Sequence, residues 1–139
     1  MMMTRSVAIG GLRQWWVALV LASCLTPWAY AEDAARGELL FEACTACHSR
    51  KPDDHNVGPS LAGIWGRKAG TTTGFRFSNA LKRSERTWDS EGLNAFLADP
   101  QQDIPGNRMP FSGIDSASDR VALIEFLRSL SLKQTALSK

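Results

Sequence analysis

Cysteine is scarce in this sequence, and the few cysteines are unevenly placed. The chain of 139 residues has three of them. Cys24 lies in an apolar N-terminal segment, whereas Cys44 and Cys47 are close together and are followed at once by His48. If Cys44 and Cys47 serve another purpose, no structural disulfide holds the rest of the chain together.

No segment shows the period-two alternation of apolar and polar residues that is typical of a half-buried β-strand. Helical spacing is present instead, most clearly in Val121, Ile124 and Leu127. The sequence therefore predicts an all-α fold. Helices are expected at residues 33–47 with Asp33 as N-cap, at 79–84 after Ser78, at 89–98, and from Ser118 onward.

The chain also lacks an excess of either charge beyond its first 31 residues. All 14 acidic residues follow position 31 and two of the 16 basic residues precede it, so residues 32–139 are formally neutral. Neutrality argues against a nucleic-acid partner, which requires a dense basic surface. No internal repeat or low-complexity linker is present, so residues 32–139 are predicted to form one small domain with a polar tail after Leu132.

Long apolar runs are confined to the N-terminus. Arg5 and Arg13 precede the run WWVALVLASCL, and the small-residue sequence AYA ends at Ala31. This order is typical of a secretory signal peptide. We therefore expect residues 1–31 to be a signal for bacterial export and residues 32–139 to be the exported domain.

Two alternatives for the N-terminal segment stay open. A cleaved signal is favoured over an uncleaved anchor because Pro27 interrupts the apolar run before it reaches the roughly 20 residues of a membrane span. The sequence LASC, ending at Cys24, resembles a lipoprotein processing site, where the cysteine would be acylated and become the mature N-terminus. The protein would then be tethered to a membrane face rather than free in the periplasm.

The sequence ACTACH, residues 43–48, has three interpretations. A redox-active CxxC pair belongs beside a βαβ pattern, which the chain lacks. A zinc site needs about four ligands, and the only other histidine, His55, lies in a charged stretch that we expect to be solvated. CxxCH is also the attachment signature of c-type haem, with His48 as an axial ligand of the iron. The export signal favours haem, because bacterial covalent haem attachment takes place outside the cytoplasm.

Methionine is even scarcer than cysteine in the predicted domain, which has one methionine and two cysteines. Three of the four methionines are the first three residues, and the fourth, Met109, lies in the Pro-rich sequence IPGNRMPF. A methionine that only fills space is expected on the apolar stripe of a helix, and Met109 is on no such stripe. We interpret its thioether as the second axial ligand of the iron.

Together these segments resemble the class I c-type cytochromes, which include mitochondrial cytochrome c and similar soluble bacterial proteins, from about Gly37 to Leu130. GELLFEACTACH is similar to the family's N-terminal helix, VGPSLAGIWGRKAG to its proximal loop, and DIPGNRMPFSG to its methionine loop. The resemblance implies a cytochrome c fold, with short helices and long loops around one haem c. It also implies that Gly37 and Phe41 contact the C-terminal helix.

The resemblance further implies roles around the haem. The carbonyl of Pro59 would accept the Nδ1 proton of His48 and fix the ring. Arg67 and Trp88 would lie near the haem propionates. The axial ligands would be His48 and Met109, and the covalent bonds would come from Cys44 and Cys47. The full set of expected cofactor-binding residues is Cys44, Cys47, His48, Pro59, Arg67, Trp88 and Met109.

Some positions depart from the family pattern. The only tyrosine is Tyr30, and Phe77 and Phe96 stand where the family has tyrosines that donate hydrogen bonds near the iron. Asn107 replaces a usual threonine, and residues 100–103, PQQD, lack the lysines of the mitochondrial protein. The family's redox tuning is therefore not expected to carry over unchanged. Part of a basic docking rim would remain from Arg67, Lys68, Arg76, Lys82, Arg83, Arg86 and Arg108.

A six-coordinate iron has no vacant position for a substrate, so we expect an electron-transfer protein and not an enzyme. The resemblance implies a monomeric periplasmic one-electron carrier that exchanges electrons with a quinol-oxidising complex, a terminal oxidase, a reductase or a dehydrogenase. Two alternatives remain: a ligand-binding or peroxidase-active haem protein in which Met109 is labile, and a small helical binding domain that uses CTACH as a thiol or zinc site without haem.

Overall fold

The computed structural model describes residues 26–137, and helices are the regular elements of that range, with one isolated antiparallel bridge between Lys68 and Thr87. Residues 1–25 of the predicted signal peptide (1–31), with Cys24, lie outside the described residues. The all-α prediction is confirmed. In chain order the elements are α2 (Thr26–Phe41), the 3₁₀ helix η2 (Glu42–Cys44), α3 (Asn79–Arg83), α4 (Ser90–Ala98), α5 (Pro100–Asp103) and α6 (Ala117–Leu137).

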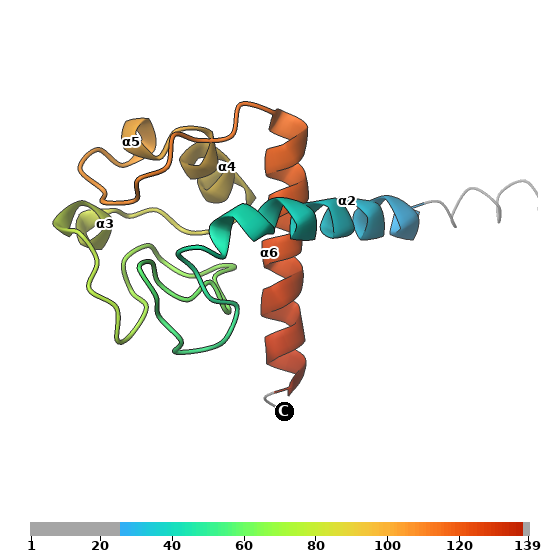
Figure 1. Ribbon diagram of the computed structural model, residues 1–139, viewed down its shortest axis with the longest axis horizontal. Coiled ribbons are helices and arrows are strands. Elements are labelled where there is room, and N and C mark those ends of the chain that lie inside the picture. Colours follow the sequence, from blue (N-terminus) through green and yellow to red (C-terminus); the bar gives the residue numbers. More distant parts are fainter. Residues whose placement is uncertain (1–25, 138–139) are drawn as a thin grey trace, which may run out of the picture.

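The N- and C-terminal helices α2 and α6 cross at close range (Figure 1). A Cβ added to Gly37 would lie 2.0 Å from the carbonyl oxygen of Ala122, so only a glycine lets the backbones approach this closely. Beside this point the rings of Phe41 and Phe126 pack with their centroids 5.3 Å apart. The predicted contacts of Gly37 and Phe41 with the C-terminal helix are confirmed.

The shorter helices begin at side chains that cap them. The Ser78 side chain accepts a hydrogen bond from the Leu81 backbone N–H, as predicted, and the Asp89 carboxylate accepts one from the N–H of Gly92. These oxygens satisfy backbone donors that have no partner within the helix. The buried face of α4 then packs against α6 (Figure 1).

Four predictions about helix bounds are wrong. The helix expected to run to residue 47 ends at Phe41 and is followed by η2, which ends at Cys44. Helix α2 begins at Thr26, so Asp33 is inside the helix and is not its cap. Residues 100–103 form α5 and not a loop, because Asp99 accepts two backbone N–H bonds and Pro100 occupies the first helical turn, where a missing N–H costs nothing. Helix α6 continues through the polar tail to Leu137, where no glycine or proline stops it.

The buried apolar residues form one cluster that joins α2, α4, α6 and the loop before α3. Phe41 and Leu123 are its most deeply buried large side chains. Met109 and Phe111 pack against its edge from the loop that precedes α6. Within residues 26–137, no helix combines the length and the apolarity needed to cross a bilayer.

Candidate functional site

A cavity of about 860 Å³ lies next to this core and is lined mainly by apolar side chains. It falls within the size range of cofactor pockets in proteins. All seven residues predicted to bind a cofactor line it, although they come from widely separated parts of the chain. The structure therefore brings together Cys44, Cys47, His48, Pro59, Arg67, Trp88 and Met109.

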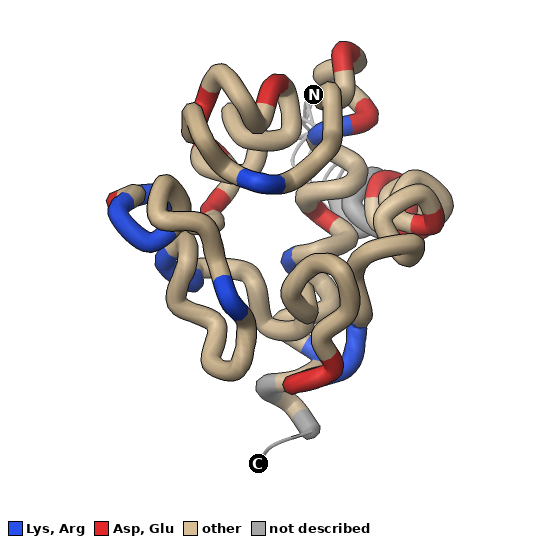
Figure 2. The backbone as a smooth tube through the Cα atoms, turned by 60° about the vertical axis from the view of Figure 1, so that its left-hand side comes forward, with Lys and Arg blue, Asp and Glu red and all other residues tan. Residues whose placement is uncertain are grey.

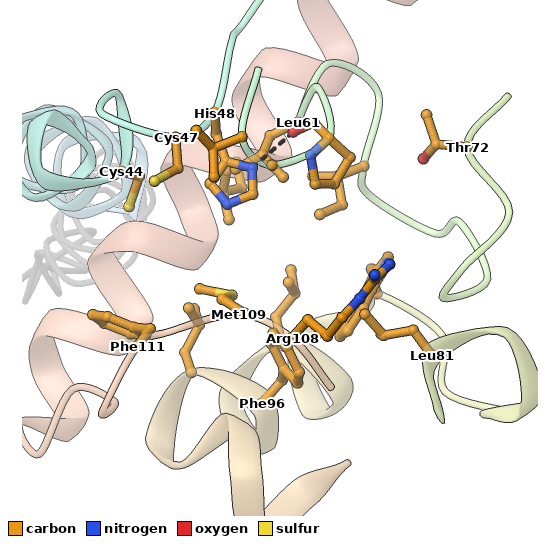
Figure 3. Close-up of a pocket in the computed structure, with 18 of the residues that line it drawn as sticks. Cys44, Cys47, His48, Leu61, Thr72, Leu81, Phe96, Arg108, Met109 and Phe111 are labelled. Carbon is orange, nitrogen blue, oxygen red and sulfur yellow. Dashed lines mark hydrogen bonds between the residues drawn. The ribbon is translucent and has the colours of Figure 1, made fainter. Parts of the chain in front are cut away.

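Cys44 and Cys47 lie at one edge of the cavity, where the chain leaves η2 (Figure 3). Backbone N–H groups of Cys47 and His48 both bond to the Cys44 carbonyl, at 3.1 and 2.9 Å, and this tight turn brings the three side chains together. Neither thiol forms a disulfide within the described chain. Burial raises the pKa of the Cys44 thiol, and the neighbouring Cys47 adds to the rise.

The His48 ring points into the cavity with a fixed orientation (Figure 3). Its Nδ1 lies 2.7 Å from the carbonyl oxygen of Pro59, which can only accept, so Nδ1 carries the proton and Nε2 keeps its lone pair. Gly58 packs against the ring so closely that a Cβ there would lie 2.4 Å from Cε1 of His48. Burial lowers the pKa of His48, and the bond to Pro59 opposes this shift.

Met109 lies on the wall opposite His48 (Figure 3). It is half-buried, in the loop between α5 and α6, and Phe96 of α4 lies on the same side of the cavity. A nitrogen lone pair and a thioether thus face one apolar space from two sides. Soft sulfur and imidazole ligands of this kind suit iron in a haem.

Arg67 and Trp88 reach the cavity from two segments that pair through their backbones. The N–H of Trp88 bonds to the Arg67 carbonyl at 2.9 Å, and the N–H of Ala69 bonds to the Arg86 carbonyl at 2.8 Å. The Arg67 guanidinium donates to the carbonyls of the preceding loop, at Ala62 and more weakly at Ser60. Burial lowers the pKa of Arg67, but an arginine keeps its proton in proteins, so a positive charge borders the cavity.

Internal contacts occupy part of the predicted basic rim. Arg86 pairs with Asp103, and Lys68 lies 2.7 Å from Glu85. Arg67 is half-buried. Figure 2 shows basic positions on several segments of the backbone. Among the described residues, the exposed members of the predicted rim without an ion pair are Arg76, Lys82, Arg83 and Arg108.

Sequence reasoning missed His55, which was expected to be solvated. The ring is half-buried and bridges two loops: its Nδ1 accepts the Ser60 N–H at 3.0 Å, so its Nε2 carries the proton and donates to the Thr73 carbonyl at 2.9 Å. His55 thereby supports the loop that holds Pro59. Its charged neighbours hid this role, because a hydrogen bond between distant segments leaves no local pattern.

The residues fit a covalently held haem. Two thiols stand at the edge of a large apolar cavity, one imidazole presents an unprotonated nitrogen into it, and a thioether faces that nitrogen. The polar lining is sparse, and it includes the basic side chains of Arg67, Arg76 and Arg108, which can compensate carboxylates on a cofactor. The fold and this site together define a helical protein that encloses a prosthetic group.

Comparisons with known proteins identify the family. A sequence model described as cytochrome c matches residues 34–131. The chain is 50% identical over 90 residues to cytochrome c2 iso-2 of Magnetospirillum molischianum, covering 65% of this chain and 93% of that protein. It is 40% identical over 99 residues to cytochrome c of Euglena viridis, covering 70% and 97%.

The structural comparison agrees. Cytochrome cH from Methylobacterium extorquens superposes with a TM-score of 0.65 and 42% sequence identity, covering 69% of this chain and 97% of that one. The chain belongs to the cytochrome c family. It is a cytochrome c2-like electron carrier and not an enzyme. Membership of the family implies redox protein partners. It also implies a haem c bound through the CxxCH motif, whose cysteines here are Cys44 and Cys47. This decides among the three interpretations of ACTACH.

Proposed function

We propose that the protein is a periplasmic one-electron carrier in which His48 and Met109 are the axial ligands of the iron. The observation that carries this proposal is the arrangement of the two side chains on opposite walls of one apolar cavity (Figure 3). Cys44 and Cys47, at the cavity edge, are the attachment points. When bound, the haem supplies a one-electron couple between Fe(III) and Fe(II).

The protein's part in this function is to hold the ligands and exclude water. Pro59 and Gly58 keep the His48 ring in one orientation and one tautomer, so Nε2 is always ready to bind. The Met109 thioether favours the reduced state, because a soft neutral ligand stabilises Fe(II) relative to Fe(III). The apolar walls act in the same direction, since burial disfavours the extra positive charge.

Arg67 and Trp88 are proposed to hold the haem propionates. The Arg67 guanidinium has donors to spare beyond its two loop carbonyls. Trp88 is 8% exposed and lines the cavity, and its indole N–H is a hydrogen-bond donor. A buried indole usually has a partner, and a carboxylate at the cavity would supply one.

The partners are proposed to be a quinol-oxidising complex on one side and a terminal oxidase, reductase or dehydrogenase on the other. Arg76 and Arg108 are exposed basic side chains that also line the cavity, so an acidic partner surface would dock close to it. Among the described residues, these two are the exposed basic side chains that line the cavity, and so small a charged contact fits weak and quickly released binding.

For the N-terminus we propose that residues 1–31 are an export signal cleaved after Ala31. The alternative is cleavage before Cys24 and acylation of that cysteine. The mass of the protein purified from a periplasm-competent bacterial host separates the two. A chain beginning at Glu32 supports the cleaved signal. A chain beginning at Cys24 with attached lipid would replace it with a membrane tether, and an intact N-terminus would replace it with an anchor.

Replacing Met109 by Ala tests the ligation. The variant should keep its haem, since Cys44 and Cys47 are untouched, but lose the weak long-wavelength ferric band of a methionine-ligated iron. It should bind carbon monoxide readily in the ferrous state, which the parent should do poorly. The matched control is Phe111→Leu, in the same loop and also lining the cavity, which should keep the parent spectrum. A Met109→Ala protein with the parent's spectrum and potential would remove Met109 from the site.

A further inference from the structure

The loop that carries Met109 is tied down by one buried amide. Asn107 is 6% exposed, and its Nδ2 donates to the carbonyls of Pro100 and Ile104 at 2.6 and 3.0 Å. Its Oδ1 accepts the backbone N–H of Met109 at 2.9 Å. This one planar group therefore joins the first residue of α5, the residue that follows α5 and the Met109 backbone.

A second amide completes this arrangement from the surface of α5. The Nε2 of Gln101 lies 3.2 Å from the Met109 carbonyl oxygen, 3.2 Å from Asn107 Oδ1 and 3.4 Å from the Asn107 carbonyl. Both backbone polar groups of Met109 are thus bonded to these two amides. Helix α5 itself is held in place by its Asp99 cap and by the pair of Asp103 with Arg86.

The far end of the loop is fixed independently. The N–H of Ile114 donates to the Leu97 carbonyl at 2.8 Å, and a Cβ on Gly113 would lie 2.0 Å from the Ala98 carbonyl oxygen. This end of the loop therefore lies directly on the last turn of α4. We expect movement of Met109 away from the cavity to begin at the other end, where the hydrogen bonds of Asn107 and Gln101 would break. The bond from Arg108 Nη2 to the Arg76 carbonyl, 2.7 Å, also holds this end.

We propose that Asn107 and Gln101 are positioning residues that keep the Met109 side chain directed into the cavity and set the rate at which the loop releases it. The inference rests on the proposed ligation by Met109. An amide suits this task because its two N–H donors and its acceptor oxygen point in different directions within one plane. A threonine at position 107 would offer an acceptor oxygen and one O–H donor. It could therefore accept the Met109 N–H but could donate only one of the two bonds to α5 and its end.

The test measures how fast imidazole binds to the oxidised haem protein in stopped flow. Imidazole can bind only after Met109 has left, so its rate at saturation reports loop opening. Asn107→Ala should raise this rate about tenfold or more, since it removes several buried hydrogen bonds, and Gln101→Ala should raise it by a smaller factor. Asn107→Thr should fall between Asn107→Ala and the parent.

The matched control is Gln102→Ala. Gln102 is the neighbour of Gln101 on α5 and is likewise exposed, but only its backbone N–H takes part in the hydrogen bonds described. Its rate should equal that of the parent. If Asn107→Ala does not fold, Gln101→Ala carries the test alone, because it changes an exposed side chain. Parent-like rates in every Asn107 and Gln101 variant that folds would overturn the proposal.

Two further measurements separate this role from general stability and from the ligation itself. Leu130→Ala weakens packing away from the cavity. If Leu130→Ala and Asn107→Ala lose the same stability in urea and speed imidazole binding by the same factor, the positioning role is wrong. If the parent lacks the methionine band and Met109→Ala binds imidazole at the parent rate, the ligation by Met109 has failed instead.

Discussion

Replacing Gly37 by Ala should destabilise the protein, although the residue lies inside a helix. On helix propensity alone the change would add about 1 kcal/mol of stability. The new Cβ, however, would lie 2.0 Å from the carbonyl oxygen and 2.6 Å from the carbonyl carbon of Ala122, and both are backbone atoms that cannot rotate away.

The magnitude follows from the separation that the two helices would need. Carbon contacts are normally about 3.5 Å or longer, so α2 and α6 would move apart by about 1 Å. That shift would loosen the packing of Phe41 against Phe126 and Leu123, and a gap of this size forfeits a quarter to a half of each contact. Overpacking typically costs about 1 to 3 kcal/mol. After the propensity gain of about 1 kcal/mol is subtracted, we expect a net loss of about 1 kcal/mol.

The assay is urea unfolding of the haem-containing protein, followed by helical circular dichroism. With a slope of about 2 kcal/mol per molar urea, the midpoint of Gly37→Ala should fall by about 0.5 M. The control is Leu39→Ala on the same helix, where the side chain is 75% exposed and the midpoint should barely change. A Gly37→Ala midpoint at or above that of the parent would refute the close-crossing argument.

Two other substitutions test contacts that join distant segments. Arg86→Ala should lower the free energy of unfolding by about 3 kcal/mol, because Asp103 is left buried and unpaired and its Oδ2 already has no partner in the described chain. The control is Arg83→Ala, which changes an exposed side chain. Equal urea midpoints for the two variants would contradict the expectation. His55→Phe should lower the free energy of unfolding by about 2 kcal/mol, because it leaves the buried Ser60 N–H without an acceptor. The control, Val57→Ala in the same loop, should leave the midpoint unchanged. A parent-like midpoint for His55→Phe would show that the His55 hydrogen bonds contribute nothing to stability.

Much of the fold is readable along the chain because its signals are local. The apolar stripe of α6 and the caps at Ser78 and Asp89 depend on residues a few positions apart. The start of α2 and the existence of α5 were not predicted correctly. Both depend on how neighbouring segments continue or cap a helix, and a capping aspartate at position 99 followed by proline is the one local signal that could have revealed α5.

The sequence alone showed that Cys44, Cys47 and His48 lie within five positions of one another, a spacing that points to a shared site. It also singled out Met109 by its isolation on a Pro-rich loop. Only the tertiary structure decided that the methionine faces the histidine across a cavity, that His55 supports the proximal loop, and that Asn107 and Gln101 hold the Met109 backbone. The physical reason for the first two is that His48 and Met109, like His55 and Thr73, lie far apart in the chain and meet only after α2, α4 and α6 have packed around the common core. Asn107 and Gln101 lie within eight positions of Met109, but their bonds depend on how α5 and the irregular loop after it fold, for which no residue pattern gives a signal.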